Sequence, residues 1–221
     1  MNITVLGTGV VGRTLAGRLA EVGHTVWLGT RDTARAEQGL VAWLAEHPGV
    51  SFATFAEAAS HGAMIVHAGN GVHAEEILAA AGEANLAGKV VIDVSNPLDF
   101  SHGFPPSLTV CNTDSLAERL QRAYPQARIV KGLNTVTAAV MVDPSLVAGP
   151  FSVFVAGDDS DARGRAAGLI AELGHTDIVD LGALTAARGL EMFLPLWLSL
   201  MQSMGSANFG VLLQRPAQST A

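Results

Sequence analysis

A glycine-rich turn near the start of the chain is the stretch whose residue types and spacing most plainly indicate chemistry. Gly7-Thr8-Gly9-Val10-Val11-Gly12 follows a short apolar segment, 2–6, and precedes apolar residues at helical spacing. In such a turn the first glycine permits a tight bend, the second lets phosphates approach the backbone, and the third lets a helix pack against the strand. The helix then offers unpaired N–H groups to an anion. The pattern predicts a dinucleotide-binding turn, with a purely structural turn as the alternative.

The end of the next predicted strand, 25–28, indicates which dinucleotide binds. In NAD sites a carboxylate about 20 residues after the glycines accepts the ribose 2′-hydroxyl, whereas NADP sites carry groups that bind a phosphate. Here Gly29-Thr30-Arg31 follows the strand. A hydroxyl and a guanidinium suit a phosphate monoester, and Thr8 is a candidate third contact. Asp32 is the competing interpretation as a ribose ligand, although it more simply caps the next helix. We therefore expect NADP.

Predicted strands and helices alternate along the rest of the chain. This is the pattern of an α/β fold of Rossmann type, with a doubly wound, mainly parallel sheet. Further strands are predicted at 50–54, 63–68, 89–94, 128–131, 151–156 and 177–180, with helices at 33–46, 55–60, 73–82 and 114–123 and from after Asp159 to near Gly174. Beyond Asn134 the doubly wound pattern changes, and Asp143-Pro144 begins a short turn or helical segment.

The last part of the chain is an apolar helical C-terminal segment. Residues 184–209 are apolar on more than one face, and the helix is expected to kink or restart near Pro195. One small sheet domain cannot cover that much apolar surface, so we expect a homodimer. We predict a Rossmann dinucleotide-binding domain over 1–133. An α/β extension with apolar helices over 134–221 is expected to complete the acceptor site and to contribute the dimer contact.

The carboxyl ends of parallel strands meet at one edge of such a sheet, where open α/β folds bind ligands. Gly69, Asn70, Asn96 and Asn134 all follow predicted strands at this edge. The Asn96 amide is placed to reach a nicotinamide, or else Asn96 simply forms a turn with the next proline. The connection over 97–110 is long enough to be functional or mobile. We predict no catalytic side chain, because hydride transfer chiefly requires two rings held close together.

The composition limits the classes of partner. With 221 residues, 49% of them hydrophobic, the chain can bury a full core. A net charge of −7 argues against nucleic acid or an anionic membrane as a partner. One cysteine, Cys111, excludes an intramolecular disulfide, and the seven histidines lack metal-ligand spacing, so no metal is predicted. The first strand begins at residue 2 and no apolar run approaches the ~20 residues of a membrane helix, so we expect a cytoplasmic protein.

Taken together, these motifs resemble the coenzyme F420-dependent NADP oxidoreductase family, small Rossmann proteins that pass hydride between NADP and a 5-deazaflavin. The resemblance covers almost the whole chain and is carried by residues 7–12, 23–31, 130–135, 155–159 and 181–196. It implies that Thr30 and Arg31 hold the 2′-phosphate. It also implies that the deazaflavin, as a co-substrate, lies against residues 133–136 and against the segment 185–190, which contains Arg188.

Two features differ from the family pattern. Members that reduce the deazaflavin carry a histidine where this chain has Asn134, and an Ile-Pro-like turn where it has Ala68-Gly69-Asn70-Gly71. The favoured function is hydride transfer between NADPH and a flat two-electron small-molecule acceptor, F420-like deazaflavin first. A reductase of another small carbonyl, imine or flavin substrate, and a non-catalytic NADPH-binding sensor, are the alternatives. Arg188 is either a cation beside the acceptor or an ordinary surface residue.

Overall fold

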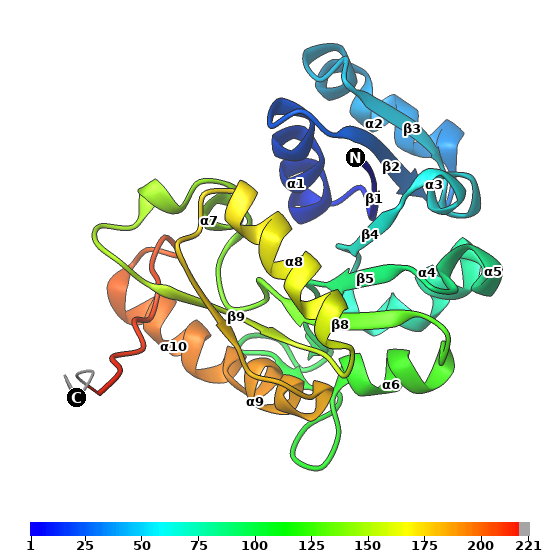
Figure 1. Ribbon diagram of the computed structural model, residues 1–221. Coiled ribbons are helices and arrows are strands. Elements are labelled where there is room, and N and C mark those ends of the chain that lie inside the picture. The colour runs from blue at the N-terminus through cyan, green and yellow to red at the C-terminus, as the bar shows by residue number, and fades with distance from the viewer. Residues whose placement is uncertain (217–221) are drawn as a thin grey trace, which may run out of the picture.

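The computed structural model describes residues 1–216, apart from the side chain of Glu37 (Figure 1). One eight-stranded sheet runs through this part of the chain, in the order β10-β9-β8-β5-β4-β1-β2-β3. Its strands are β1 (Asn2–Leu6), β2 (Thr25–Thr30), β3 (Val50–Thr54), β4 (Met64–His67), β5 (Val90–Asp93), β8 (Arg128–Gly132), β9 (Ser152–Ala156) and β10 (Asp177–Asp180). This sheet confirms the expected Rossmann-type α/β fold.

The strand order reverses direction between β1 and β4. From β1 the chain adds β2 and β3 on one side, then returns to add β4, β5 and β8 on the other, and all of these pairs are parallel. In open parallel sheets the crevice at such a reversal, outside the carboxyl ends of the strands, is where ligands bind. The residues that leave β1 and β4, Gly7 and Ala68, therefore stand at the expected ligand position.

The last two strands run against the others. β9 pairs antiparallel with β8, with Lys131 opposite Ala156, and β10 pairs parallel with β9. An antiparallel neighbour needs no long crossover, so only two short helices separate β8 from β9, α7 (Ala138–Val142) and η2 (Pro144–Leu146). The sequence predicted the change of pattern and the turn at Pro144, but not α7.

Helices cover both faces of the sheet and enclose two apolar cores (Figure 1). One core joins the sheet to α1 (Val10–Glu21), α2 (Thr33–Glu46), α7 and α8 (Ser160–Glu172). The other joins it to α3 (Phe55–His61), α4 (Ala74–Ala81), α6 (Leu116–Ala123), η3 (Leu184–Ala186) and α9 (Ala187–Met192). Successive strand residues face opposite sides, so Ile3 and Val5 pack in the first core and Leu6 in the second.

Smaller elements complete the described chain. They are η1 (Gly71–His73), α5 (Glu83–Leu86) and a two-stranded antiparallel ribbon of β6 (Leu98–Asp99) and β7 (Ser107–Leu108). The ribbon lies within the connection over 97–110, where the sequence predicts no strand. Helix α6 begins later than predicted because Ser115 caps it, its Oγ accepting from Glu118 N at 3.1 Å, while Asp114 pairs with Arg122 at 2.8 Å.

The C-terminal helix restarts as expected. Helix α10 (Leu194–Met204) begins directly after α9 and carries Pro195 in its first turn. Leu194 and Leu198 are buried, whereas Leu196 and Met204 are more than half exposed. The last five residues of the expected extension, 217–221, lie outside the described residues. Within residues 1–216, no helix is long and apolar enough to cross a membrane.

Candidate active site

The glycine turn after β1 is shaped by close backbone contacts. Gly7 has a φ of +124°, and a Cβ added there would stand 2.8 Å from the carbonyl oxygen of Ala68. A Cβ added at Gly12 would stand 1.8 Å from the carbonyl oxygen of Gly7. Apart from Gly9 itself and its two chain neighbours, no described atom lies within 4 Å of a Cβ built on Gly9. The turn therefore has one crowded side, which packs β1, α1 and the exit of β4 together, and one open side at Gly9.

The open side meets the start of α1. Gly9 is the residue before the helix, no side chain among the described residues caps it, and Val10 is 67% exposed. Helix N-termini carry unpaired N–H groups and the positive end of the helix dipole. The open glycine and this helix end form a cradle for an anion such as a pyrophosphate. The crevice thus fits the dinucleotide that the sequence predicts.

The end of β2 contributes one exposed cation. The Arg31 side chain is 70% exposed, and its Nη2 lies 3.8 Å from Glu76 Oε2 at the start of α4. Thr30 is buried. Asp32 caps α2, its Oδ1 accepting from Arg35 N at 3.1 Å, which confirms the simpler of its two interpretations.

The exit of β4 lies against both neighbouring exits. Ala68 N donates to Leu6 O at 2.9 Å, which ties it to the glycine turn. Asn70 is exposed, and its Oδ1 accepts from Val72 N at 3.1 Å. A Cβ on Gly71 would stand 2.1 Å from Asn96 O, so the turn after β5 packs directly against this connection. Gly69 and Asn70 therefore lie between the glycine turn and Asn96.

Asn96 and Asn134 form a reciprocal pair. Asn134 Nδ2 donates to Asn96 Oδ1 at 2.9 Å and to Leu190 O at 2.9 Å, and Asn96 Nδ2 donates to Asn134 O at 3.1 Å. The backbone acceptors fix the orientation of both amides. Asn134 is 3% exposed, and its Oδ1 has no hydrogen-bond partner within residues 1–216. That oxygen is an unused acceptor at the carboxyl edge.

Four ionisable side chains are buried beneath this edge. His67 Nδ1 lies 2.9 Å from Asp93 Oδ1, and Lys131 Nζ lies 2.7 Å from Asp93 Oδ2 and 2.9 Å from Glu191 Oε1. The Glu191 carboxylate also accepts from the N–H groups of Leu116 at 2.7 Å and of Ala117 at 3.1 Å, the first turn of α6. Each of the four ionisable side chains is at most 1% exposed. The network ties α9 to β8 and α6.

Burial and pairing act on these charges in opposite directions. Burial alone would raise the pKa of Asp93, but the charge of Lys131 and the hydrogen bond from His67 hold that pKa well below its usual range. Burial alone would lower the pKa of Lys131, but the carboxylates of Asp93 and Glu191 outweigh it and raise that pKa. Both groups therefore stay charged near neutral pH.

Helix α9 closes the edge over a small apolar cavity. The cavity has a volume of about 160 Å³ and is lined among others by Val136, Phe154, Leu190 and Phe193. Arg188 does not line it. Its guanidinium pairs with both carboxylate oxygens of Glu118, at 2.7 and 2.9 Å, and this hydrogen bonding lowers the pKa of Glu118.

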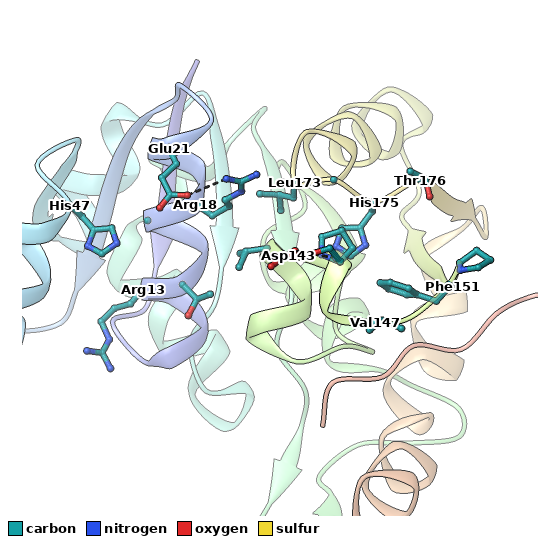
Figure 2. A pocket seen from close by; sticks show the side chains of 18 of the residues that line it. Arg13, Arg18, Glu21, His47, Asp143, Val147, Phe151, Leu173, His175 and Thr176 are labelled. Atoms are coloured by element: carbon teal, nitrogen blue, oxygen red, sulfur yellow. Dashed lines mark hydrogen bonds and ion pairs between the residues drawn. The ribbon is translucent and has the colours of Figure 1, made fainter. Parts of the chain in front are cut away.

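A larger cavity lies away from this edge. It has a volume of about 910 Å³ and runs between α1 and the segment that joins α7 to β9. Figure 2 shows Arg13, Arg18 and Glu21 on its α1 side and Phe151 and His175 on the other. None of the predicted cofactor residues is among those that line it, so this cavity is separate from the candidate site at the carboxyl edge.

Comparison with known proteins decides the family. The model for "NADP oxidoreductase coenzyme F420-dependent" matches residues 2–97. The F420-dependent NADP reductase of Methanothermobacter marburgensis is 32% identical over 212 residues, which cover 90% of this chain and 92% of that protein. The chain belongs to the F420-dependent NADP oxidoreductase family.

Two other relatives show how far the similarity extends. A solved structure from Arthrobacter sp. FB24, provisionally assigned as an F420-dependent NADP reductase, is 50% identical, with a TM-score of 0.95 over 97% of this chain and 100% of that one. Metalloreductase STEAP3 of Rattus norvegicus is 31% identical over 201 residues, which cover 89% of this chain. The matched region spans only 38% of the length of STEAP3. Family membership confirms the expected resemblance, the oxidoreductase class and NADP as the nucleotide.

The sequence does not predict the buried charges beneath the edge. Sequence analysis predicts no role for His67, Asp93, Lys131 or Glu191. A signal was present, because Asp93 and Lys131 each end an otherwise apolar strand segment, and a charge at such a position needs a partner. The sequence does not show which partner that is, since Glu191 is far along the chain.

Proposed function

We propose that this protein transfers a hydride between NADPH and an F420-like deazaflavin at the carboxyl edge of its sheet. One observation carries the proposal. The open glycine cradle, the Asn96–Asn134 pair and the apolar cavity beneath α9 follow one another along that edge, from β1 to β8 and β9. The order provides an anion site for a dinucleotide at one end and an apolar, uncharged wall for a flat ring at the other.

The nucleotide residues are proposed from this arrangement. Gly7, Thr8, Gly9, Val10, Val11 and Gly12 would hold the pyrophosphate at the start of α1. Thr30 and Arg31 would hold the 2′-phosphate, with Thr30 acting from a buried position and Arg31 from an exposed one. Gly69 and Asn70 would lie against the pyrophosphate and ribose. When bound, NADPH supplies the hydride.

Asn96 and Asn134 would form the wall beside the nicotinamide and the acceptor. The Oδ1 of Asn134 is buried and has no hydrogen-bond partner within residues 1–216, so it can accept a hydrogen bond from an amide or a ring N–H of a group that reaches it beneath the edge. We propose Arg188 as a contact for an anionic edge of the acceptor, a role in which it must compete with Glu118 for the same guanidinium. The proposal assigns no side chain a proton-transfer role, because positioning two rings supplies most of the catalysis in direct hydride transfer.

A second candidate is reduction of a small imine or carbonyl substrate. The observation that favours it is Asn134 itself, where deazaflavin-reducing members of the family carry a histidine. Its unused Oδ1 is an acceptor that suits an N–H donor, such as a protonated imine, as well as it suits a deazaflavin.

A panel of acceptors separates the two candidates. Oxidation of NADPH is followed with F420, free flavin, and a series of carbonyl and imine compounds. We expect turnover with F420. Asn134→Ala is expected to lower kcat/KM by about 10- to 100-fold, a loss of roughly 1.4–2.7 kcal/mol of transition-state stabilisation. Turnover with an imine and none with F420 would replace the first candidate by the second. No turnover with any acceptor, despite NADPH binding, would favour a non-catalytic sensor.

Arg188 is tested in the same assay. Arg188→Ala is combined with Glu118→Gln, so that no carboxylate is left unpaired, and is compared with Arg119→Ala, which removes an exposed cation from α6. A higher KM for F420, with an unchanged KM for NADPH, is expected of the first variant and not of the second. Equal KM values in both variants would remove Arg188 from the site.

We also propose that the protein forms a homodimer and that its two domains, 1–133 and 134–221, meet between residues 133 and 134. We further propose that it is cytoplasmic and does not bind nucleic acid. The exposed apolar residues of α10 support the first proposal. The reversal of strand direction after β8 supports the second. The net charge of −7 argues against nucleic acid as a partner.

A further inference from the structure

A carboxylate, an imidazole and a guanidinium lie close together near the carboxyl end of β1. Glu76, in the first turn of α4, has its Oε2 3.2 Å from His73 Nδ1 and 3.8 Å from Arg31 Nη2. Arg31 follows β2, whereas His73 and Glu76 follow β4, and β1 lies between these two strands in the sheet. The contact between Arg31 and Glu76 therefore spans the crevice that begins at the glycine turn.

This contact uses the guanidinium that the 2′-phosphate of NADP would need. A phosphate monoester carries about −1.5 to −2 charges at neutral pH. If the Glu76 carboxylate stays beside Arg31, a phosphate that binds Arg31 is repelled by it, because both groups are negatively charged. The 2′-hydroxyl of NAD has no charge, and a carboxylate near it can accept its hydrogen bond.

We infer that Glu76 is a specificity-determining residue that opposes the 2′-phosphate and so narrows the preference for NADPH over NADH. The inference rests on the proposed nucleotide site. In the structure Glu76 pairs with Arg31. The 2′-phosphate must displace that carboxylate, whereas NADH binds with it in place.

The size of the effect follows from exposure. The side chains of Arg31 and Glu76 are 70% and 67% exposed, so water and salt screen the interaction and Glu76 can swing aside. Removing the charge should therefore change affinity several-fold rather than by orders of magnitude. The effect should also be largest at low ionic strength.

The test titrates NADPH and NADH against the wild type, Glu76→Gln and Glu75→Gln, at low and at physiological salt. Glutamine keeps the shape of the side chain and removes its charge. Glu75 is the matched control, because it is the neighbouring exposed acid on α4 and forms no ion pair within residues 1–216. We expect Glu76→Gln to tighten NADPH binding about three- to tenfold at low salt without tightening NADH binding.

The same titrations with Arg31→Ala, alone and combined with Glu76→Gln, distinguish the role of Glu76 from that of the NADP site. If Glu76 acts by competing for Arg31, most of the gain from Glu76→Gln disappears in that background. Equal tightening of both nucleotides, or the same gain from Glu75→Gln, would overturn the role of Glu76 and leave the NADP site intact. Equal affinity of the wild type for both nucleotides, unchanged in Arg31→Ala, would overturn both.

Discussion

At the scale of single residues, the carboxyl edge stands on buried charges rather than on apolar packing alone. Asp93 accepts from His67, Lys131 and the Ser95 hydroxyl, and Lys131 Nζ also reaches Ser95 O at 2.6 Å. A buried charge is tolerated only when it is paired and hydrogen-bonded, and removing one partner leaves the other exposed to the full desolvation penalty. These residues thus hold the ends of β4, β5 and β8 at fixed positions beneath Asn96 and Asn134.

Asp93 makes the free energy of unfolding depend on pH. Its folded-state pKa lies below the unfolded value near 3.9, so its contribution to stability is complete above that value and is lost as the pH falls through the acid range. Asp93→Asn should lower the free energy of unfolding by about 3–5 kcal/mol at pH 7. The gap between wild type and variant should shrink by roughly 1.4 kcal/mol for each pH unit below about 4.

Urea unfolding at pH 7, 4 and 3 measures that gap. Asp161→Asn, which removes an exposed acid at the start of α8, is the control and should stay within about 0.5 kcal/mol of the wild type at each pH. A gap for Asp93→Asn that is equally large at pH 7 and pH 3 would show that its carboxylate is not the group that carries the effect.

At the scale of elements, the sequence predicted what local patterns determine. Gly7, Gly9 and Gly12 mark a turn whose contacts leave no room for a Cβ at two of the three positions, so the spacing itself reflects the packing. Strands buried on both faces are continuous apolar runs, and Asp32 stands where a helix cap belongs. Pro195 likewise marks the restart of the last helix, because proline is tolerated in a first turn.

What the sequence could not supply depends on contacts between distant residues. Asn134 was placed at the edge from its position after a strand, but its partner Asn96 is 38 residues away and its second acceptor, Leu190 O, is 56 residues away. The same holds for Glu191, which caps α6 from 75 residues away. For Arg188 the sequence leaves two interpretations open, a cation beside the acceptor or an ordinary surface residue. Nothing local indicates that its Nε and Nη2 donate to Glu118.

At the scale of the whole molecule, α10 and the chain after it expose apolar side chains. Leu196 is 55% and Met204 56% exposed, and Leu212 and Leu213 are more than 40% exposed. Stacking of Trp197 on Phe209, with ring centroids 5.3 Å apart, holds the following chain against this helix. Large exposed apolar patches mark interaction surfaces, and a two-fold dimer is the commonest closed assembly. These side chains are therefore the candidate contact of the proposed dimer.

Light scattering during size exclusion tests the dimer. We expect twice the 22.8 kDa mass of one chain for the wild type, and the mass of one chain for Leu196→Glu, because a charge in the contact leaves a carboxylate desolvated. Val41→Glu is the control, since Val41 is an equally exposed apolar residue on α2. A wild-type mass near that of one chain at every concentration would rule the dimer out.

In the proposed reaction, hydride passes directly from NADPH to a flat acceptor held beside it. The most direct measurement follows deuterium placed at C4 of the nicotinamide, on each face in turn, during reduction of F420. We expect label from one face to appear in the reduced deazaflavin, one deuterium for each NADPH oxidised, while the other face keeps its label. Release of that deuterium to water, or oxidation of NADPH without labelled product, would contradict it.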